Sequence, residues 1–328
     1  MNYNETKKIF EELFTHKMND EQMRDFLLSM KLDESTTVES IAAAASVMRA
    51  HALPLCVDES LKPKLIDIVG TGGDKIGSFN ISSTVALLCA GAGCFVAKHG
   101  SRSITSKSGS ADMFEKLGVK LDLSIENSSK LLEETGFTFM FAANHHPCMK
   151  FIMPVRKSIP QKTIFNILGP LTNPASVQKS MLGVFDRVFV PKIVEALRIN
   201  NTKSALVVSS RESMDEISIS DTTYAARLLD NHIEEFEIDP QNFGIKRAPL
   251  EAILGGSADF NAALVLDIFS NQASEPQRDI VLINAAASFV VDGMARDFQD
   301  GLEIARETIK SGKAMKKLKK IVEVSSRL

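Results

Sequence analysis

A short apolar segment that runs directly into a glycine-rich loop constrains the fold of this chain more than any other feature. Residues 65–69 read Leu-Ile-Asp-Ile-Val, and Gly-Thr-Gly-Gly-Asp follows at 70–74. Helix-like stretches separate this segment from further short apolar segments at 94–97, 137–141 and 205–208. Strands that alternate with helices predict an α/β fold, with a mainly parallel central sheet covered by helices on both faces. In such a sheet the ligand lies beyond the carboxyl ends of the strands.

The first sixty residues have a different pattern, in which apolar residues recur at helical spacing. A second helix is expected to begin after Asn19 or Asp20, and a third after Thr36 or Thr37, because these side chains are good N-terminal caps. No strand pattern precedes residue 64. We therefore predict a small N-terminal helical domain.

The pattern changes near Pro63, which predicts a domain boundary. We expect a helical domain over residues 1–63, joined by a segment near 160–185, and a larger α/β domain over residues 64–328. The last seventy residues are mainly helical, although the short run at 263–266 fits a strand or a helix equally well.

Composition excludes several classes of function. The chain of 328 residues is 44% hydrophobic and carries a net charge of −3, with a pI of about 6.1. A general nucleic-acid-binding protein usually carries a basic face, so none is expected here. The charged N-terminus is unlike a signal peptide, and no apolar run has the ~18 residues that a membrane helix needs. Because no C-x-x-C pair occurs, the cysteines are expected to be free thiols of a cytoplasmic protein.

Three segments could bind a polyanion. The loop at 70–74 lets backbone N–H groups approach a phosphate, but it could also be only a tight turn, and it matches neither a Walker A loop nor G-x-G-x-x-G. Small polar residues at 80–84 could bind phosphate or metal, or simply cap a helix. The segment 98–110 carries three cations, one histidine and five serines, which favours a loop that wraps a polyanion over a solvated helix face.

Two further features could bind a metal ion and a carboxylate. Asp215 and Glu216 follow a predicted strand, where a pair of carboxylates could hold Mg²⁺ together with water and substrate phosphates. Arg156 could bind a carboxylate through a two-pronged hydrogen bond, or be a surface residue. The adjacent His145 and His146 do not make a zinc site without further ligands.

In this order and spacing, the segments resemble the anthranilate phosphoribosyltransferase family, within the nucleoside phosphorylase and phosphoribosyltransferase class of this fold. The matching segments are GTGGD at 70–74, FNISS at 79–83, KHGSRSITSKSGSAD at 98–112, HHPCMKFIMPVRK at 145–157, TIFNILGPLTNPA at 163–175 and MDEIS at 214–218.

The resemblance implies an enzyme of tryptophan biosynthesis. Such an enzyme transfers the phosphoribosyl group of phosphoribosyl pyrophosphate (PRPP) to the amine of anthranilate, giving N-(5-phosphoribosyl)anthranilate and pyrophosphate. It also implies about two Mg²⁺ ions per chain and a homodimer formed through the helical domain. A glutamine amidotransferase of anthranilate synthase is an expected partner or fused domain. The amine needs to be held in line behind the ribose carbon, so no strong general base is nominated.

The resemblance also assigns site residues. Anthranilate would contact Gly70, Ser101 and Arg156, and magnesium would bind Ser82, Asp215 and Glu216. PRPP would be bound by Gly70, Gly73, Asp74, Ser78, Asn80, Ile81, Ser82, Ser83, Lys98, His99, Gly100, Ser101, Arg102, Ser103, Ile104, Thr105, Ser106 and Ser110.

Three of these positions depart from the family pattern. Ser78 and Ser83 stand in place of threonines and keep the hydroxyl. Ser101 stands in place of an asparagine that the family uses at the anthranilate site, so this chain lacks an amide there.

Two alternatives share the expected fold. A pyrimidine nucleoside phosphorylase would carry a loop resembling K-x-S-T-G-G-V-G-D and would not need the paired carboxylates, whereas this chain has GTGGDK and Asp215-Glu216. A non-catalytic relative that binds nucleic acid would need a basic stripe, which the pI of about 6.1 opposes.

Overall fold

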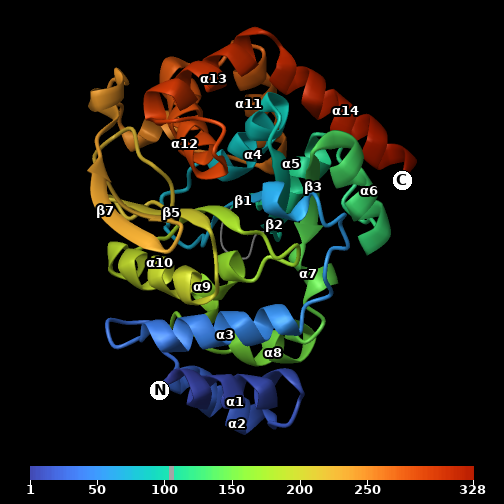
Figure 1. The fold of residues 1–328 in the computed structure, drawn as a ribbon, viewed down its shortest axis with the longest axis vertical. Helices are drawn as coiled ribbons and strands as arrows, with labels where there is room; N and C mark the ends of the chain where they lie inside the picture. Colours follow the sequence, from blue (N-terminus) through green and yellow to red (C-terminus); the bar gives the residue numbers. More distant parts are fainter. Residues whose placement is uncertain (103–106) are drawn as a thin grey trace.

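The computed structural model describes residues 1–102 and 107–328, which fold around a seven-stranded sheet in the order β3-β2-β1-β4-β5-β6-β7 (Figure 1). The first five strands in that order run parallel, and β6 and β7 are antiparallel additions at one edge. The bounds are β1 Leu65–Gly70, β2 Phe95–Gly100, β3 Phe137–Phe141, β4 Lys179–Gly183, β5 Ser204–Ser210, β6 Thr223–Leu229 and β7 His232–Ile238.

The structure confirms the four strands predicted from apolar runs, which became β1, β2, β3 and β5. Every residue of β5 is buried, and so is every residue of β1 except its last. Strands of a parallel sheet are covered by helices on both faces, so continuous apolar runs are the pattern they need. The ambiguous run at 263–266 is helical, because it lies inside α11 (Ala258–Phe269), which Ser257 caps.

Three strands, β4, β6 and β7, were not predicted from the sequence. β4 contains only five residues, begins Lys-Ser, and pairs with β1 on one side and β5 on the other. β7 reads His-Ile-Glu-Glu-Phe-Glu-Ile and is largely exposed at the sheet edge. Neither β4 nor β7 has the apolar run of a buried strand, so only pairing with neighbouring strands gives them their conformation.

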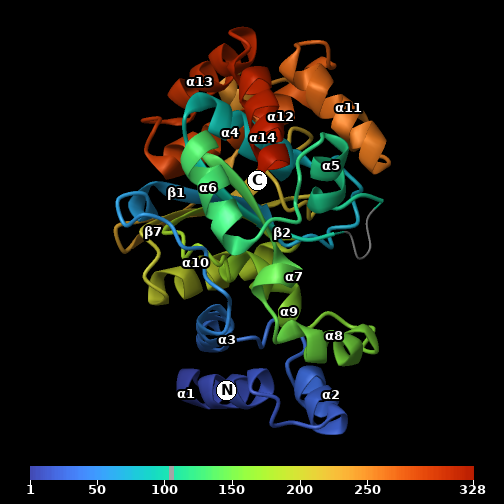
Figure 2. The ribbon, with the colours of Figure 1, turned by 90° about the vertical axis from the view of Figure 1, so that its right-hand side faces the viewer.

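One face of the sheet packs against a thick layer of helices, which lies above the strands in Figures 1 and 2. Buried apolar side chains from α4, α11, α12 and α13 form a single core with strands β1, β2 and β5. The helices of this half are α4 Ile81–Ala92, α5 Ser110–Lys116, α6 Ile125–Thr135, α11, α12 Glu275–Asp292, α13 Phe298–Lys310 and α14 Lys313–Arg327.

The opposite face packs against α10 (Val190–Ile199), and the N-terminal helices lie below it (Figures 1 and 2). Asn2, Asn19 and Thr37 cap the three N-terminal helices through their side chains, as the sequence predicted for the second and third. This helical layer consists of α1 Tyr3–Phe14, α2 Asp20–Ser29, α3 Val38–Ala50, α7 Ala142–His145, α8 Met149–Lys157 and α9 Phe165–Leu168.

Backbone hydrogen bonds join the N-terminal helices to the segment that follows α8. The N–H of Leu32 donates to the carbonyl of Lys162, and the N–H of Ile164 donates to the carbonyl of Met30. Buried side chains of this layer, including Phe10 and Phe165, belong to one core with α10 and the lower face of the sheet. Short 3-10 helices complete the chain at Lys62–Lys64, Gly169–Leu171, Arg187–Phe189, Pro240–Phe243 and Leu250–Ile253.

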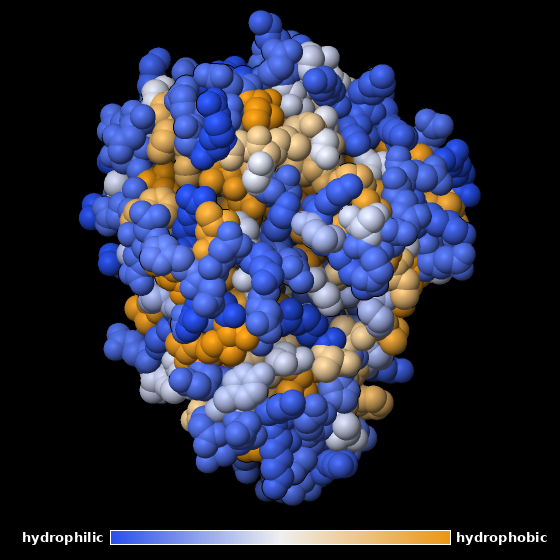
Figure 3. Space-filling model, viewed as in Figure 1, coloured by the Kyte–Doolittle hydropathy of each residue, from blue (hydrophilic) through white to orange (hydrophobic). Residues whose placement is uncertain are grey.

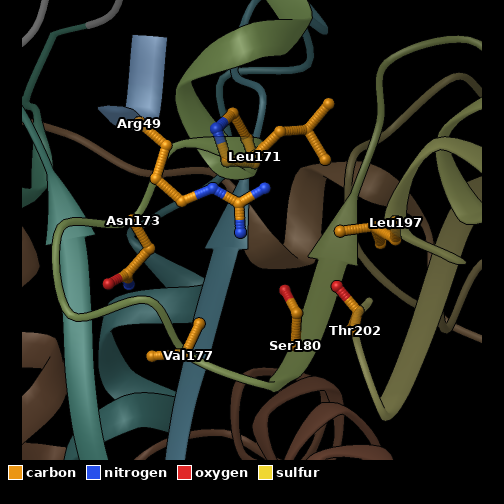
Figure 4. A pocket seen from close by; sticks show the side chains of 8 residues that line it. Arg49, Leu171, Asn173, Val177, Ser180, Leu197 and Thr202 are labelled. Atoms are coloured by element: carbon orange, nitrogen blue, oxygen red, sulfur yellow. The ribbon is translucent and has the colours of Figure 1, made fainter. Parts of the chain in front are cut away.

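A small polar cavity lies where α3 meets the sheet. It has a volume of about 20 Å³, and Arg49 of α3 extends into it toward Ser180 and Thr202 (Figure 4). Burial lowers the pKa of Arg49, whose guanidinium forms no hydrogen bond or ion pair with another described residue. A cavity of this size accommodates about one water molecule, which could hydrate the guanidinium.

The surface is mainly hydrophilic on the face that Figure 3 shows, with apolar residues between the charged ones. Across residues 1–102 and 107–328, no helix combines the length and the apolar character needed to cross a membrane.

Candidate active site

The predicted glycine loop and acidic pair lie at the same edge of the sheet. The loop 70–74 follows the carboxyl end of β1, and Asp215 and Glu216 follow the carboxyl end of β5. β4 lies between these two strands, so its last residue, Gly183, borders both loops. The parallel order of the strands therefore brings together segments that are far apart in the chain.

Close packing of two glycines fixes the position of Asp215. A Cβ atom built on Gly70 would lie 2.3 Å from Oδ2 of Asp215, and one built on Gly183 would lie 1.6 Å from its carbonyl oxygen. The N–H of Gly72 donates a hydrogen bond of 2.6 Å to Oδ2 of Asp215. Only glycine permits this approach at either strand end. Gly183 was not expected to border the site, because it lies in a strand that the sequence pattern does not reveal.

Glu216 connects the acidic pair to the start of α4. Its Oε1 accepts a hydrogen bond of 2.9 Å from the N–H of Ser82, in the first turn of that helix. A carboxylate is stabilised at a helix N-terminus, because the N–H groups there lack partners within the helix. The backbone of the half-buried Ser82 is thus held beside the carboxylate of Glu216.

Lys98 lies beneath these groups. Its side chain is buried, and its Nζ donates to the carbonyl of Ile68 and, at 3.4 Å, to Oγ of Ser82. Burial lowers the pKa of Lys98, and the carboxylates of Asp67, Glu216 and Asp215 oppose that shift. Lys98 therefore positions Ser82 and places a positive charge under the acidic pair.

Burial also perturbs the two carboxyl groups. It raises the pKa of Asp215 to about 7, and the neighbouring Asp74 carboxylate contributes to the shift. The pKa of Glu216 rises well above its usual value because of burial and the nearby Asp215. Buried carboxylates this close together are stable in their charged form only when a cation compensates them.

These residues fit a magnesium ion. Among the described residues, no group of three or more His, Cys, Asp or Glu side chains is arranged to hold a metal by itself. Mg²⁺ prefers one or two carboxylates, with water and substrate phosphate as its remaining ligands. Asp215, Glu216 and the hydroxyl of Ser82 supply such a partial set of oxygen ligands.

A buried network behind Lys98 was not predicted. Asn173 donates from Nδ2 to Asp67 at 2.7 Å and to the carbonyl of Ala97 at 2.8 Å. Asp67 also accepts the N–H of His99 at 3.2 Å. Burial raises the pKa of Asp67 to about 6, although Lys98 and these hydrogen bonds act against the shift. Asn173 lies in the GPLTNP segment, but nothing in its local sequence indicates that it meets Asp67.

The predicted histidines are buried and neutral. The Nδ1 of His99 lies 3.1 Å from the carbonyl oxygen of Gly169, and its ring is 5.1 Å from that of His146. Burial and the neighbouring His146 lower the pKa of His99 to about 3, while burial and His145 lower that of His146 to about 4. These values do not suit acid–base catalysis at neutral pH.

Within the segment 78–83, the side chain of Asn80 faces the neighbouring loops, and those of Ile81 and Ser83 face the core. Ile81 and Ser83 are buried, and Ser78 forms an isolated antiparallel bridge with Leu254. Asn80 occupies the cap position of α4, but its side chain makes no capping hydrogen bond. It contacts Asn261 and the carbonyl of Ser108 instead.

The third predicted polyanion segment, residues 98–110, is only partly described, because Ser103, Ile104, Thr105 and Ser106 lie outside the described residues. Gly100 ends β2, where a Cβ would lie 2.6 Å from Oγ of Ser110. That hydroxyl donates to the carbonyl of Ser101 at 3.2 Å. Arg102 pairs with Asp112 and with Glu115, so two carboxylates of α5 neutralise its guanidinium.

Arg156 lies on α8 in the helical layer. Its guanidinium lies over the ring of Phe165, 5.7 Å from the ring centre, and burial lowers its pKa. The guanidinium forms no ion pair or hydrogen bond with any other residue in the described part of the chain. A half-buried arginine without an internal counterion is suited to binding a carboxylate from outside.

Lys162 is a further residue that the sequence did not indicate. Its Nζ donates to the carbonyl of Gly73 at 2.9 Å and lies 3.1 Å from the centre of the Phe185 ring. It thereby links the segment after α8 to the glycine loop. An adjoining cavity of about 570 Å³ is lined by Lys31, Leu32, Asp33, Glu34, Gly73, Asp74, Lys75, Lys162, Phe185, Asp186, Val188, Phe189 and Ser213.

Comparison with known proteins agrees with this geometry. Residues 62–315 match the glycosyl transferase family, a/b domain. The anthranilate phosphoribosyltransferase of Rhodopseudomonas palustris (strain TIE-1) is 40% identical over 322 residues, which is 98% of this chain and 94% of that protein.

Solved structures give the same result. The anthranilate phosphoribosyltransferase of Thermus thermophilus has a TM-score of 0.92 at 34% identity, covering 99% of this chain and 96% of that one. The Saccharomyces cerevisiae enzyme, solved in complex with PRPP and Mg, has a TM-score of 0.87 at 27% identity, covering 98% and 92%. This chain therefore belongs to the anthranilate phosphoribosyltransferase family.

Proposed function

We propose that this protein transfers the phosphoribosyl group of PRPP to the amine of anthranilate. The observation that carries the proposal is the meeting of Asp215 and Glu216 with the glycine loop and Ser82 at one sheet edge. Relatives of nearly the same length carry the name of this activity. Neither the pyrimidine nucleoside phosphorylase nor the nucleic-acid-binding alternative gains support from the structure.

The proposed metal is Mg²⁺, with about two ions per chain held by Ser82, Asp215 and Glu216 together with substrate phosphate. The yeast relative was solved with PRPP and Mg. Bound Mg²⁺ would neutralise the charge that develops on the departing pyrophosphate. The raised pKa values of both carboxyl groups support this role, because a bound cation would favour the charged carboxylates and so oppose the effect of burial.

PRPP is proposed to lie across the glycine loop, the start of α4 and the segment that follows β2. Lys98 contributes through its charge and through its hold on Ser82, and not through an exposed ammonium. The proposed contacts are Gly70, Gly73, Asp74, Ser78, Asn80, Ile81, Ser82, Ser83, residues 98–106 and Ser110.

Anthranilate is proposed to lie between the helical layer and the glycine loop, near Gly70 and Ser101. Arg156 would bind its carboxylate and so aim its amine at the ribose carbon. Because His99 and His146 are neutral and buried, we assign no general base. The amine would lose its proton after the new bond to carbon has begun to form.

The same proposal includes a homodimer formed through the helical domain, residues 1–63 joined by a segment near 160–185. The packing of residues 162–164 against the N-terminal helices supports this division. A glutamine amidotransferase/anthranilate synthase partner or fused domain belongs to the same proposal, and the synthase would supply anthranilate. Cytoplasmic localisation is proposed because Cys56, Cys89, Cys94 and Cys148 are all free thiols.

The test is to mix the protein with PRPP, Mg²⁺ and anthranilate and to follow the loss of anthranilate fluorescence. We expect loss that requires all three components and stops when a chelator is added. A pyrimidine nucleoside with inorganic phosphate serves as the control pair. Phosphorolysis of the nucleoside without consumption of anthranilate would overturn the proposal.

A further inference from the structure

The side chain of Asn80 belongs to a hydrogen-bond chain that extends from α11. Its Oδ1 accepts a bond of 2.8 Å from Nδ2 of Asn261, and Asn261 in turn accepts the N–H of Gly256 at 2.9 Å through Oδ1. Asn261 is buried in the first turns of α11. The segment before it is tied to the residues before Asn80 by the bond from the N–H of Gly255 to the carbonyl of Gly77.

This chain fixes which way the Asn80 amide faces. A backbone N–H can only donate, so Gly256 requires an oxygen, and the Oδ1 of Asn261 must point toward it. The Nδ2 of Asn261 then faces Asn80 and requires an oxygen there. Consequently the Nδ2 of Asn80 points the other way, where it donates to the carbonyl of Ser108 at 3.3 Å.

We propose that Asn261 is a positioning residue that makes Asn80 present N–H groups to the phosphorylated substrate. This inference rests on the proposed function, in which Asn80 contacts PRPP. Phosphate oxygens accept hydrogen bonds and cannot donate them when ionised, so an amide binds phosphate only through its NH₂ end. If Asn80 turned over, its carbonyl oxygen would face the phosphate and repel it.

Replacing Asn261 by aspartate tests the orientation while preserving size. The Asn261→Asp carboxylate still accepts the N–H of Gly256, but it cannot donate to Asn80, whose amide must turn over. We expect the KM for PRPP to rise by about tenfold, as for loss of a hydrogen bond to a charged group. The KM for anthranilate should change much less, because Asn80 is not assigned to that substrate.

Asn261→Ala separates orientation from packing. Alanine removes the donor to Oδ1 of Asn80, but the carbonyl and hydroxyl of Ser108 still favour the original orientation of the amide. The KM for PRPP should therefore rise less than with Asn261→Asp. A purely structural role predicts the reverse order, because alanine leaves a void and the N–H of Gly256 without a partner. Because of this void and the unpaired N–H, thermal unfolding should show Asn261→Ala to be less stable than Asn261→Asp, even though its KM for PRPP is expected to be lower.

A double-mutant cycle distinguishes reorientation of the Asn80 amide from direct repulsion between the new carboxylate and PRPP. In an Asn80→Ala background, Asn261→Asp should cause no further loss of PRPP affinity, whereas simple repulsion by the new carboxylate would persist. Asn200→Asp is the matched control, because Asn200 ends α10 and donates to the carbonyl of Ala42 in α3, away from the glycine loop and α11. It should leave both Michaelis constants unchanged.

The outcomes distinguish this inference from the proposed function. An unmodified enzyme that does not consume anthranilate with PRPP overturns the proposed function. An active enzyme whose KM for PRPP is unaffected by Asn261→Asp, or is raised more by Asn261→Ala, overturns the role of Asn261 alone.

Discussion

The two sides of the proposed active site are built differently. On the PRPP side, the buried Asp215 is hydrogen-bonded to the glycine loop, and the half-buried Glu216 is hydrogen-bonded to the start of α4. On the anthranilate side, Arg156 lies on a short helix of another layer, over a ring, with no ion pair to another described residue. Contacts within the protein therefore fix the side chains of the PRPP side in the absence of substrate. On the anthranilate side, no protein carboxylate among the described residues pairs with the arginine that is proposed to bind substrate.

The difference has a physical cause. Buried carboxylates need a fixed set of donors and a cation, so rigid strand ends suit them. An arginine binds a substrate carboxylate most strongly when its guanidinium is not already paired with a carboxylate of the protein. Lys162 links the two sides, because it belongs to the segment after α8 and donates to Gly73 of the glycine loop. The following predictions test this contrast, beginning with the largest expected effect.

The combined change Asp215→Asn and Glu216→Gln should lower kcat by at least about a hundredfold, because the charge needed to hold Mg²⁺ is lost. The fold should persist, since burial penalises the charged form of both side chains and the amides are similar in shape. Steady-state kinetics and thermal unfolding measure the two effects. Full activity in the double variant, or wild-type activity in chelator, would contradict a metal role.

PRPP with Mg²⁺ should raise the melting temperature without anthranilate, because its side of the site is already formed. A ligand that binds only the folded state stabilises it by about 2.7 kcal/mol at a hundredfold excess over its dissociation constant. Differential scanning fluorimetry at millimolar PRPP is sufficient. A larger shift with anthranilate alone would reverse the comparison between the two sides.

Gly183→Ala should disturb the PRPP side through the backbone of Asp215, whose carbonyl oxygen a Cβ would meet at 1.6 Å. We expect a loss of about 1–3 kcal/mol in the free energy of unfolding, the usual cost of forced repacking. A higher Mg²⁺ requirement for turnover should accompany it. Gly169→Ala is the control, because its Cβ meets nothing within 4 Å among the described residues. Equal behaviour of the two variants would show that contact with β4 does not hold Asp215 in place.

Arg156→Ala should raise the KM for anthranilate by roughly tenfold, since a hydrogen bond to a charged group contributes about 1.5–3 kcal/mol. The KM for PRPP should move much less. Arg156→Lys should restore only part of the loss, because an ammonium lacks the two-pronged geometry. A variant that weakens PRPP alone would place the aromatic acid elsewhere.

Ser101→Asn should have the smallest effect, and in the opposite direction. It returns the amide that the resemblance expects at this position, so anthranilate should bind equally well or up to about threefold better. Measuring the KM for both substrates shows whether the change stays on the anthranilate side. A rise in the KM for PRPP would indicate that Ser101 contacts PRPP and not anthranilate.

The sequence predicted most of the scaffold through local patterns. Apolar runs located β1, β2, β3 and β5, because strands covered on both faces need uninterrupted apolar residues. Polar caps located the starts of α2 and α3. β4 and β7 escaped prediction because pairing with neighbours, and not local composition, determines their conformation.

By itself the sequence determined the family and the sheet class, and it indicated the segments proposed to carry the chemistry, because glycine loops, caps and apolar runs act locally. Tertiary structure decided how these segments act on one another. Gly183 has no side chain and so leaves room for the backbone of Asp215, and Asn261 orients Asn80, which lies 181 positions away in the chain. The side chain of Lys98, whose contact with phosphate stays a prediction, is buried beside Ser82. Such contacts depend on which strand ends become neighbours in the sheet, and no short stretch of the sequence indicates the order of the strands.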